Sequence, residues 1–235
     1  MIVIRIVSRF RTVQALVIAT IGLGVSPMLG DAFAASPSKI PCRPGRAKLL
    51  AANTQAVVYV GSVVDPSTHL RIKTFLGCAR GGRRAFEVGG PGESSSSGGS
   101  ATRNLTLTGQ VVGWEEHERT TGTTGELGRD EWTIIVRNLR TGRILHKLPT
   151  GAAIVREWTG VGPTTEIVVS ASGDVAWIAR VADAQGLHGY EVHVADKAGS
   201  RLLATGSNIA PNSLALAGNT LYWTQGGQPS SAPLS

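Results

Sequence analysis

The chain has 235 residues, of which 42% are hydrophobic and 17% charged, and its formal net charge is +7. This apolar content is sufficient for a folded protein of one or two domains. The 30 glycines and 11 prolines argue against a helical bundle, because glycine supplies the positive φ angles of tight hairpins and both residues interrupt helices.

The first 34 residues have the layout of a secretory signal peptide. Three arginines lie among the first eleven residues, an apolar run follows over 13–29, and an Ala-x-Ala cleavage pattern ends at Ala34. We expect cleavage after Ala34 and a secreted or extracytoplasmic protein. The alternative is an uncleaved membrane anchor, although the run is barely long enough to span a bilayer. No later segment reaches that length, so no membrane association is expected after cleavage.

Two cysteines remain in the mature chain, Cys42 and Cys78. Outside the cytoplasm such a pair usually forms a disulfide. We expect it to tie the N-terminal segment, residues 35–46, to the rest of the chain and to stabilise the fold by roughly 3–4 kcal/mol. Two free buried thiols or a redox pair are the alternatives, although the spacing fits neither a Cys-x-x-Cys redox motif nor a zinc motif.

From residue 47 to residue 235 the sequence predicts short antiparallel strands. Runs rich in Val, Ile, Leu and Trp are bounded by Gly, Ser, Asn or Pro, and no segment has a long 3.6-residue apolar period. The runs fall into repeated four-stranded units, the last of them incomplete, at about 47–90, 103–150, 164–207 and 212–235. The stretch "ESSSSGGS" (93–100) between the first two has the composition of a flexible linker.

An aromatic residue marks the second strand of each unit. The four markers are Tyr59, Trp114, Trp177 and Trp223. Repeated aromatic residues at equivalent positions are typical of contacts between neighbouring units. We therefore expect these side chains to fill the core between successive units.

Two segments of the third unit carry a resemblance to a known family. The stretch "SASGDVAWIAR" (170–180), followed by "YEVHVADKAGSRLLATGS" (190–207), resembles the blade motif of Tol-type and WD-like β-propellers of bacterial exported proteins, and "RNLRTGRIL" (137–145) is similar. The resemblance implies an all-β, partial or small, about four-bladed propeller-like fold in a bacterial exported protein. It leaves open a small ring, an open series of blades, or a ring closed by a second copy as a homo-oligomer. It implies fold more than function.

In such up-and-down units the short turns lie at one end of the strands and the long loops at the other. Long loops gathered on a rigid scaffold are typical of a binding face. The binding candidates on this face are Trp158, Arg119, Arg129, Asp130 and His188, beside the further polar residues Asp65, His69, Glu126 and Glu157. Trp158 either fills the face or offers a stacking surface.

Motifs of catalysis and of cofactor binding give no positive signal. The sequence contains no nucleophile elbow, no P-loop and no dinucleotide-binding fingerprint. Glu191 and His193 share a strand face and suit a metal ion, but we interpret them as polar residues on a half-exposed face. Glu115 and His117 also share a face, which we interpret as a solvated strand end. We assign no catalytic residue, no metal ligand and no cofactor.

The basic residues are scattered, apart from "ARGGRR" (79–84), which we interpret as a solvated turn. Nucleic-acid binders cluster such residues on one face with aromatic side chains, so no nucleic-acid partner is expected. The leading hypothesis is an exported, non-catalytic scaffold that binds a protein, a glycan or a small ligand through its long-loop face. The alternatives are a hydrolase or lyase with a site among these loops, and an incomplete repeat protein that needs a partner to close.

Overall fold

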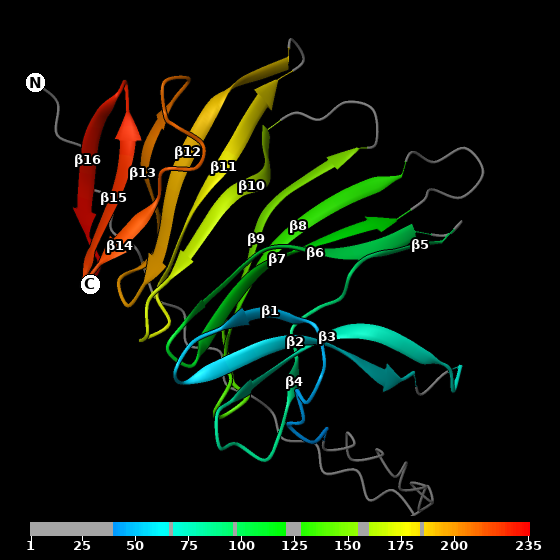
Figure 1. Cartoon of the computed structure of the whole chain (residues 1–235). Coiled ribbons are helices and arrows are strands. Elements are labelled where there is room, and N and C mark those ends of the chain that lie inside the picture. The colour runs from blue at the N-terminus through cyan, green and yellow to red at the C-terminus, as the bar shows by residue number, and fades with distance from the viewer. Residues whose placement is uncertain (1–39, 66–67, 96–97, 121–127, 155–159, 184–185) are drawn as a thin grey trace, which may run out of the picture. The chain divides into compact units, whose positions relative to one another are not determined.

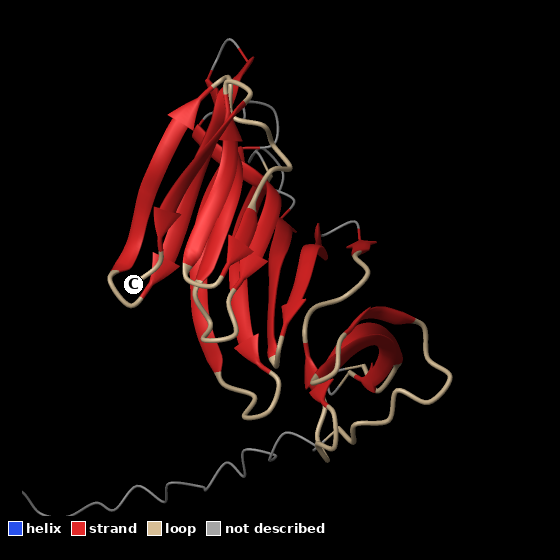
Figure 2. Ribbon diagram, turned by 60° about the vertical axis from the view of Figure 1, so that its left-hand side comes forward, coloured by secondary structure: helices blue, strands red, loops and turns tan. Residues whose placement is uncertain are grey.

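The computed structural model describes residues 40–65, 68–95, 98–120, 128–154, 160–183 and 186–235. The expected signal peptide lies outside the described residues. Within these ranges the chain consists of strands joined by turns and loops, with no helix (Figure 2). In the same ranges, no helix has the length and apolar character that crossing a membrane requires.

The strands form four antiparallel sheets that follow one another along the chain (Figure 1). The first sheet contains β1 (Leu49–Ala52), β2 (Ala56–Val64), β3 (Arg71–Ala79) and β4 (Phe86–Glu87). The second contains β5 (Glu93–Ser95), β6 (Gly98–Thr108), β7 (Val111–Thr120), β8 (Arg129–Asn138) and β9 (Ile144–Ile154). The third contains β10 (Gly160–Val169), β11 (Val175–Asp183), β12 (Gly186–Asp196) and β13 (Gly199–Gly206), and the fourth β14 (Ala215–Ala217), β15 (Thr220–Gln225) and β16 (Gln228–Pro233).

The predicted all-β fold of antiparallel sheets is confirmed, but the strands are not four to a sheet throughout. The sheets contain four, five, four and three strands. The extra strand of the second sheet is β5, which pairs with the start of β6 from Glu93 opposite Ser100. The interpretation of 93–100 as a linker was therefore wrong, because a Ser- and Gly-rich segment still forms a backbone ladder when it folds back on an adjacent strand.

The inner strands of the third sheet have apolar side chains on both faces, through which this sheet packs on the sheets before and after it. In β11, Val175 and Trp177 belong to a buried cluster with the second sheet, whereas Ala176 and Ile178 belong to a cluster with the fourth. Successive residues of a strand point to opposite faces, so a strand covered on both sides needs apolar residues at odd and even positions alike. The core is thus a series of apolar layers between consecutive sheets.

The three marker tryptophans occupy these layers. Trp114 clusters with Ala56 and Val58 of the first sheet. Trp177 clusters with Ile134 and Val136 of the second sheet, and Trp223 with Val192 and Val194 of the third. Each indole therefore packs on the preceding sheet, which confirms the expected place of these residues in the core.

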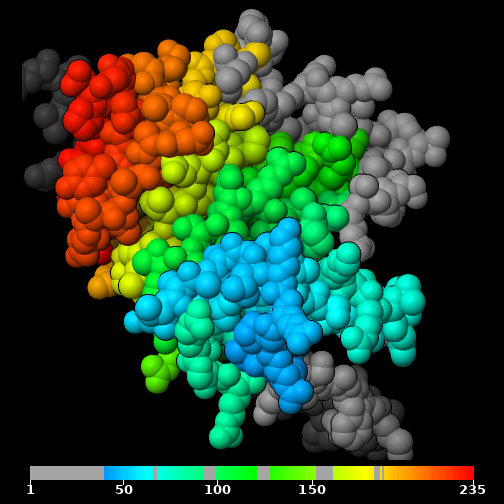
Figure 3. Space-filling view, in the orientation of Figure 1, coloured from blue at the N-terminus to red at the C-terminus, as the bar shows by residue number. Residues whose placement is uncertain are grey.

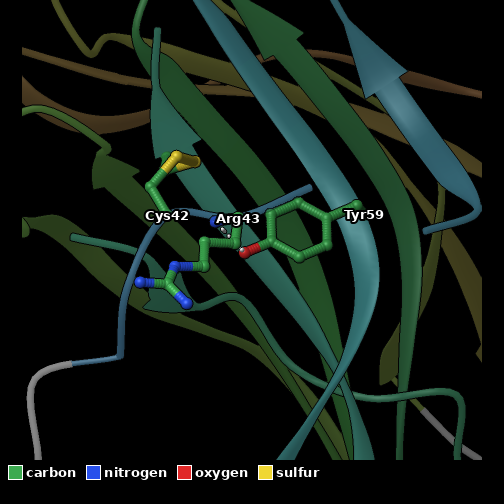
Figure 4. Close-up of a disulfide and its surroundings, with 4 residues drawn as sticks. Cys42, Arg43 and Tyr59 are labelled. Atoms are coloured by element: carbon green, nitrogen blue, oxygen red, sulfur yellow. Dashed lines mark hydrogen bonds between the residues drawn. A yellow bond between two sulfur atoms is a disulfide. The ribbon is translucent and has the colours of Figure 1, made fainter. Parts of the chain in front are cut away.

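At the corresponding position of the first sheet, Tyr59 packs on the N-terminal segment instead. It clusters with Cys78, and Ile40 and Cys42 pack against the same cluster. The predicted disulfide joins Cys42 to Cys78, with 5.9 Å between the Cα atoms, and the backbone N–H of Arg43 donates to the Tyr59 hydroxyl at 3.4 Å (Figure 4). The segment thus replaces a preceding sheet, and the disulfide is consistent with an oxidising compartment.

The outer edge of β16 offers few hydrogen-bond donors. The N–H of Leu234 donates to Asn219, toward β15, so by alternation the N–H groups of odd-numbered residues point outward. Two of these positions are Pro229 and Pro233, which have no N–H, and the N–H of Ser235 is bound by Asp196 at 3.0 Å. Proline at an edge opposes the addition of a further strand.

Candidate functional site

A cleft with a volume of about 330 Å³ lies between the first two sheets. Its walls come from β3 and β4 on one side and from β6, β7 and β8 on the other, and the link over 89–92 runs along it. Figure 3 shows the blue-to-cyan atoms of the first sheet against the green atoms of the second. The link follows β4 and precedes β5, and it belongs to the links that the sequence predicts at the long-loop end, whereas Arg137 stands near the opposite end of β8, one residue before Asn138.

Hydrogen bonds hold the link to both sheets. The carbonyl of Gly89 accepts from the N–H of Phe75 at 2.8 Å and from the Thr74 hydroxyl at 2.7 Å. One residue further, the N–H of Gly90 donates to Thr102 Oγ1 at 2.9 Å, and its carbonyl accepts from the N–H of Thr102 at 3.1 Å. The polar contacts of Thr74 and Thr102 therefore fix the position of the link.

Gly89 is the residue of the link that tolerates no side chain. Its φ is +93°, a conformation that favours glycine. A Cβ atom at this position would lie 1.8 Å from Thr102 Oγ1. The sequence "GGPG" (89–92) thus reflects a close crossing of the backbone between two sheets rather than a flexible spacer.

Four charged side chains line the cleft, and one of them, the half-buried Arg137, has a buried Nε without an acceptor among the described residues. Lys73 and Glu87 contribute from the first sheet, Glu116 and Arg137 from the second. Nε of Arg137 is buried and has no hydrogen-bond acceptor among the described residues. Burial lowers the pKa of Arg137, and the negative charge of Glu87 opposes this shift, yet a guanidinium group stays protonated in proteins.

The negative charge of Glu87 acts on Arg137. Glu87 Oε1 and the Gly89 carbonyl each lie 2.7 Å from Thr74 Oγ1 and share its single proton. Among the described residues, Glu87 therefore acts on Arg137 through its charge and not through a hydrogen bond to Nε. A buried charged donor without an acceptor is costly, and a hydrogen-bond acceptor placed in the cleft would remove this cost.

The apolar part of the cleft is formed by Trp114 and Ile135, which are opposite one another in the β7–β8 register. Both side chains are buried. The indole N–H of Trp114 has no acceptor among the described residues, but the same holds for Trp132, Trp177 and Trp223. This N–H therefore does not mark a site by itself, whereas Arg137 Nε is the one cationic donor among the described residues that is buried without an acceptor.

Two of the predicted binding residues, Arg119 and Asp130, are in contact in the structure. His117, which was not among the predicted binding residues, also contacts Asp130. Arg119 Nε lies 2.8 Å from Asp130 Oδ1, and Nη2 lies 3.1 Å from Oδ2. His117 Nε2 lies 2.7 Å from the same Oδ1, and its ring stacks on Trp132 at 5.3 Å between centroids. The hydrogen bond from Arg119 is the main reason that the pKa of Asp130 is lowered.

The other predicted binding residues do not join this cluster. Arg129 pairs with Glu131 at 2.8 Å, and both side chains are exposed. His188 lies exposed in β12. Trp158, like Glu126 and Glu157, lies outside the described residues. Of the predicted binding residues that the structure describes, Arg119, Arg129, Asp130 and His188, none lines the cleft between the first two sheets.

One interpretation of a polar strand residue was wrong. Glu115 is not part of a solvated strand end: its exposure is 0%, because its face of β7 is turned toward the third sheet. Glu191 and His193 are partly exposed, at 18% for each side chain; His193 stacks on Trp177 at 5.1 Å and lies 2.8 Å from Glu191. Among the described residues, no group of three or more His, Cys, Asp or Glu side chains is arranged to hold a metal ion.

Sequence reasoning missed the cleft because its charged residues come from four strands. The signal that could have pointed to it is "GGPG" (89–92), which directly precedes the segment predicted as a linker. Comparisons of the chain with protein-family models, with curated proteins and with solved structures gave no match.

Proposed function

We propose that this protein is an exported, propeller-like repeat scaffold that binds a small polar ligand, without catalysis, in the cleft between its first two sheets. The observation that carries the proposal is the half-buried side chain of Arg137, whose buried Nε has no acceptor among the described residues, in a cleft of about 330 Å³. Proteins place small ligands in concave sites with an apolar wall and a few converging polar groups. Trp114 and Ile135 supply such a wall here.

The propeller-like arrangement is supported by the repeated contact between consecutive sheets. Each marker tryptophan packs on the sheet before it, and the N-terminal segment covers the first sheet in the same way. Export is supported by the signal-peptide layout of 1–34 and by the disulfide between Cys42 and Cys78.

One part of the cleft lies toward the long-loop end. Lys73 and Ile72 stand at the start of β3, directly after the loop 65–70, and the link 89–92 crosses at the same end. Loops and links carried on packed sheets are held in place by the scaffold, which favours a preformed binding site.

A substitution that fills the cleft with a bulky side chain tests the proposal. Ser100 lines the cleft and is exposed, so Ser100→Phe should cover it, whereas Ser231→Phe adds the same side chain to the exposed face of the last sheet. Saturation-transfer NMR with neutral monosaccharides, uronic acids and N-acetyl amino acids should detect binders of the wild type. We expect these binders to be lost in Ser100→Phe and retained in Ser231→Phe; equal binding by both variants would place the ligand elsewhere and reject the cleft.

A further inference from the structure

We infer that the ligand of this cleft carries a carboxylate group, which pairs with the guanidinium of Arg137. The inference rests on the function proposed above and narrows it to a chemical class. Three features of the cleft lead to it: the position of Arg137, its local charge balance, and its apolar wall.

Arg137 stands on the face of β8 that the first sheet covers. In the β7–β8 register Trp114 is opposite Ile135, and Arg137 is two residues further along the same face, opposite Val112. Its Nε is buried and has no acceptor among the described residues. The planar guanidinium group presents paired N–H donors whose spacing matches the two oxygens of a carboxylate.

Glu87 and Glu116, the two carboxylates among the described residues that line the cleft, do not bind Arg137 Nε. Glu87 Oε1 is bound by the Thr74 hydroxyl at 2.7 Å, and Glu116 lines the cleft from the neighbouring strand. The guanidinium thus has attractive charge nearby but no hydrogen-bond acceptor among the described side chains. A ligand oxygen would supply the missing acceptor and remove the cost of a buried, unpaired donor.

The charge balance of the cleft favours a singly charged group. Two cations, Lys73 and Arg137, face two carboxylates, Glu87 and Glu116. A doubly charged phosphate would meet stronger repulsion from both glutamates than a carboxylate does. The cleft therefore discriminates between anions through its acidic residues as well as through Arg137.

The apolar wall formed by Trp114 and Ile135 accommodates the part of the ligand that does not carry the carboxylate. A cavity of about 330 Å³ suits a molecule of monosaccharide or amino-acid size. A sugar acid and an acylated amino acid share the required chemistry. Both present one carboxylate beside a compact body with apolar faces. The experiment has one arm for each of these two sources.

Isothermal titration calorimetry with two matched pairs of probes tests the inference. One pair is glucuronate and glucose, and the other is N-acetyl-L-alanine and its C-terminal amide. We expect the acid of at least one pair to bind about tenfold or more tightly than its neutral partner, as charge-assisted hydrogen bonds imply. The pair that shows the difference identifies the source of the carboxylate.

Two variants assign the effect to Arg137. Arg137→Met keeps an unbranched apolar stem and removes the charge, and it should abolish the preference for the acid. Arg140→Met removes an exposed charge in the turn after β8 and should retain the preference. The melting temperature of Arg137→Met should be unchanged or higher, because a half-buried cation is lost whose Nε has no acceptor among the described residues; a lowered melting temperature with an intact preference would make Arg137 a structural residue and overturn the inference.

The remaining outcomes separate the two proposals. If acid and neutral probes bind the wild type equally, the carboxylate inference is overturned while ligand binding in the cleft stands. If none of the four probes binds the wild type, both proposals are overturned.

Discussion

The side chain of Glu115 in β7 accepts a hydrogen bond from the backbone N–H of Thr164 in β10, with 2.7 Å between Oε1 and N, across 49 residues of sequence. The carboxyl group is fully buried, and its Oε2 has no partner among the described residues. Asn104 donates to the carbonyl and to the hydroxyl of the same Thr164, at 2.8 Å each. A buried polar contact therefore joins the second sheet to the third beside an otherwise apolar layer.

The buried carboxyl group of Glu115 makes the free energy of unfolding depend on pH. Burial raises the pKa of Glu115, against the opposing hydrogen bond from Thr164. An acid with a raised pKa in the folded state contributes its full stability below the unfolded pKa of about 4.3 and loses it as pH rises through the folded pKa. We expect Glu115→Gln to remove this loss, so that the variant gains free energy of unfolding relative to the wild type between pH 4 and pH 8.

Urea denaturation at several pH values measures this difference. Glu118→Gln is the control, because Glu118 is an exposed residue of the same strand. A difference between Glu115→Gln and the wild type that stays constant with pH would contradict the prediction.

Asp196 should show the opposite pH dependence. Its side chain has no exposed surface and accepts hydrogen bonds from Arg201 at 2.7 Å, from the N–H of Ala198 at 2.9 Å and from the N–H of Ser235 at 3.0 Å. The bond from Arg201 leads the causes that lower the pKa of Asp196 to about 2. A lowered pKa gives stability that is present above the unfolded pKa of about 3.9 and is lost as pH falls toward 2.

We expect Asp196→Asn to lower the free energy of unfolding by about 2 kcal/mol at pH 7 and by much less near pH 2. Chemical denaturation monitored by fluorescence at both pH values tests this. Glu131→Gln, which removes one partner of an exposed pair, should change little at either pH. An equal loss for Asp196→Asn at both pH values would show that the aspartate is not the titrating group.

The tryptophan layers give a prediction about packing. Trp177 is 4% exposed and lies in the cluster between the second and third sheets. Trp177→Ala should lower the free energy of unfolding by about 3–5 kcal/mol through lost burial and the resulting cavity. Tyr222 is the matched control, since it is 41% exposed on the last sheet, and Tyr222→Ala should stay within about 0.5 kcal/mol of the wild type. Similar losses in the two variants would contradict the role assigned to the tryptophan.

The link between the first two sheets gives a prediction about the cleft. Gly89 and Gly199 both have positive φ, +93° and +103°. A Cβ on Gly89 would collide with Thr102 Oγ1 at 1.8 Å, whereas a Cβ on Gly199 would have no heavy atom within 4 Å. Alanine at either position adds backbone strain of about 1 kcal/mol, but only at Gly89 does it also displace the link.

Gly89→Ala should therefore destabilise the protein more than Gly199→Ala does and should weaken binding to the cleft, while Gly199→Ala leaves binding unchanged. Thermal denaturation and calorimetry of the two variants provide the measurement. Equal effects of the two substitutions would mean that the link tolerates a side chain.

The sequence was sufficient to predict the repeated strands, the place of Trp114, Trp177 and Trp223 in the core, and the Cys42–Cys78 disulfide. These features depend on local alternation, on a recurring aromatic position and on a single pair of cysteines. The hairpin formed by β5 and β6 escaped prediction, because serine and glycine carry little strand signal and the ladder depends on an edge that only the fold supplies.

The tertiary structure alone decided which polar residues are buried and which meet. Alternation placed Glu115 and His117 on one face of β7, but it did not reveal that the third sheet covers this face. Both faces of this inner strand pack against other sheets, so the sequence pattern does not identify a solvent side. In the same way, Lys73, Glu87, Glu116 and Arg137 come from four strands and converge only when two sheets pack and a glycine link crosses between them. Contacts of this kind follow from the packing of separate sheets, and no local pattern in the chain encodes them.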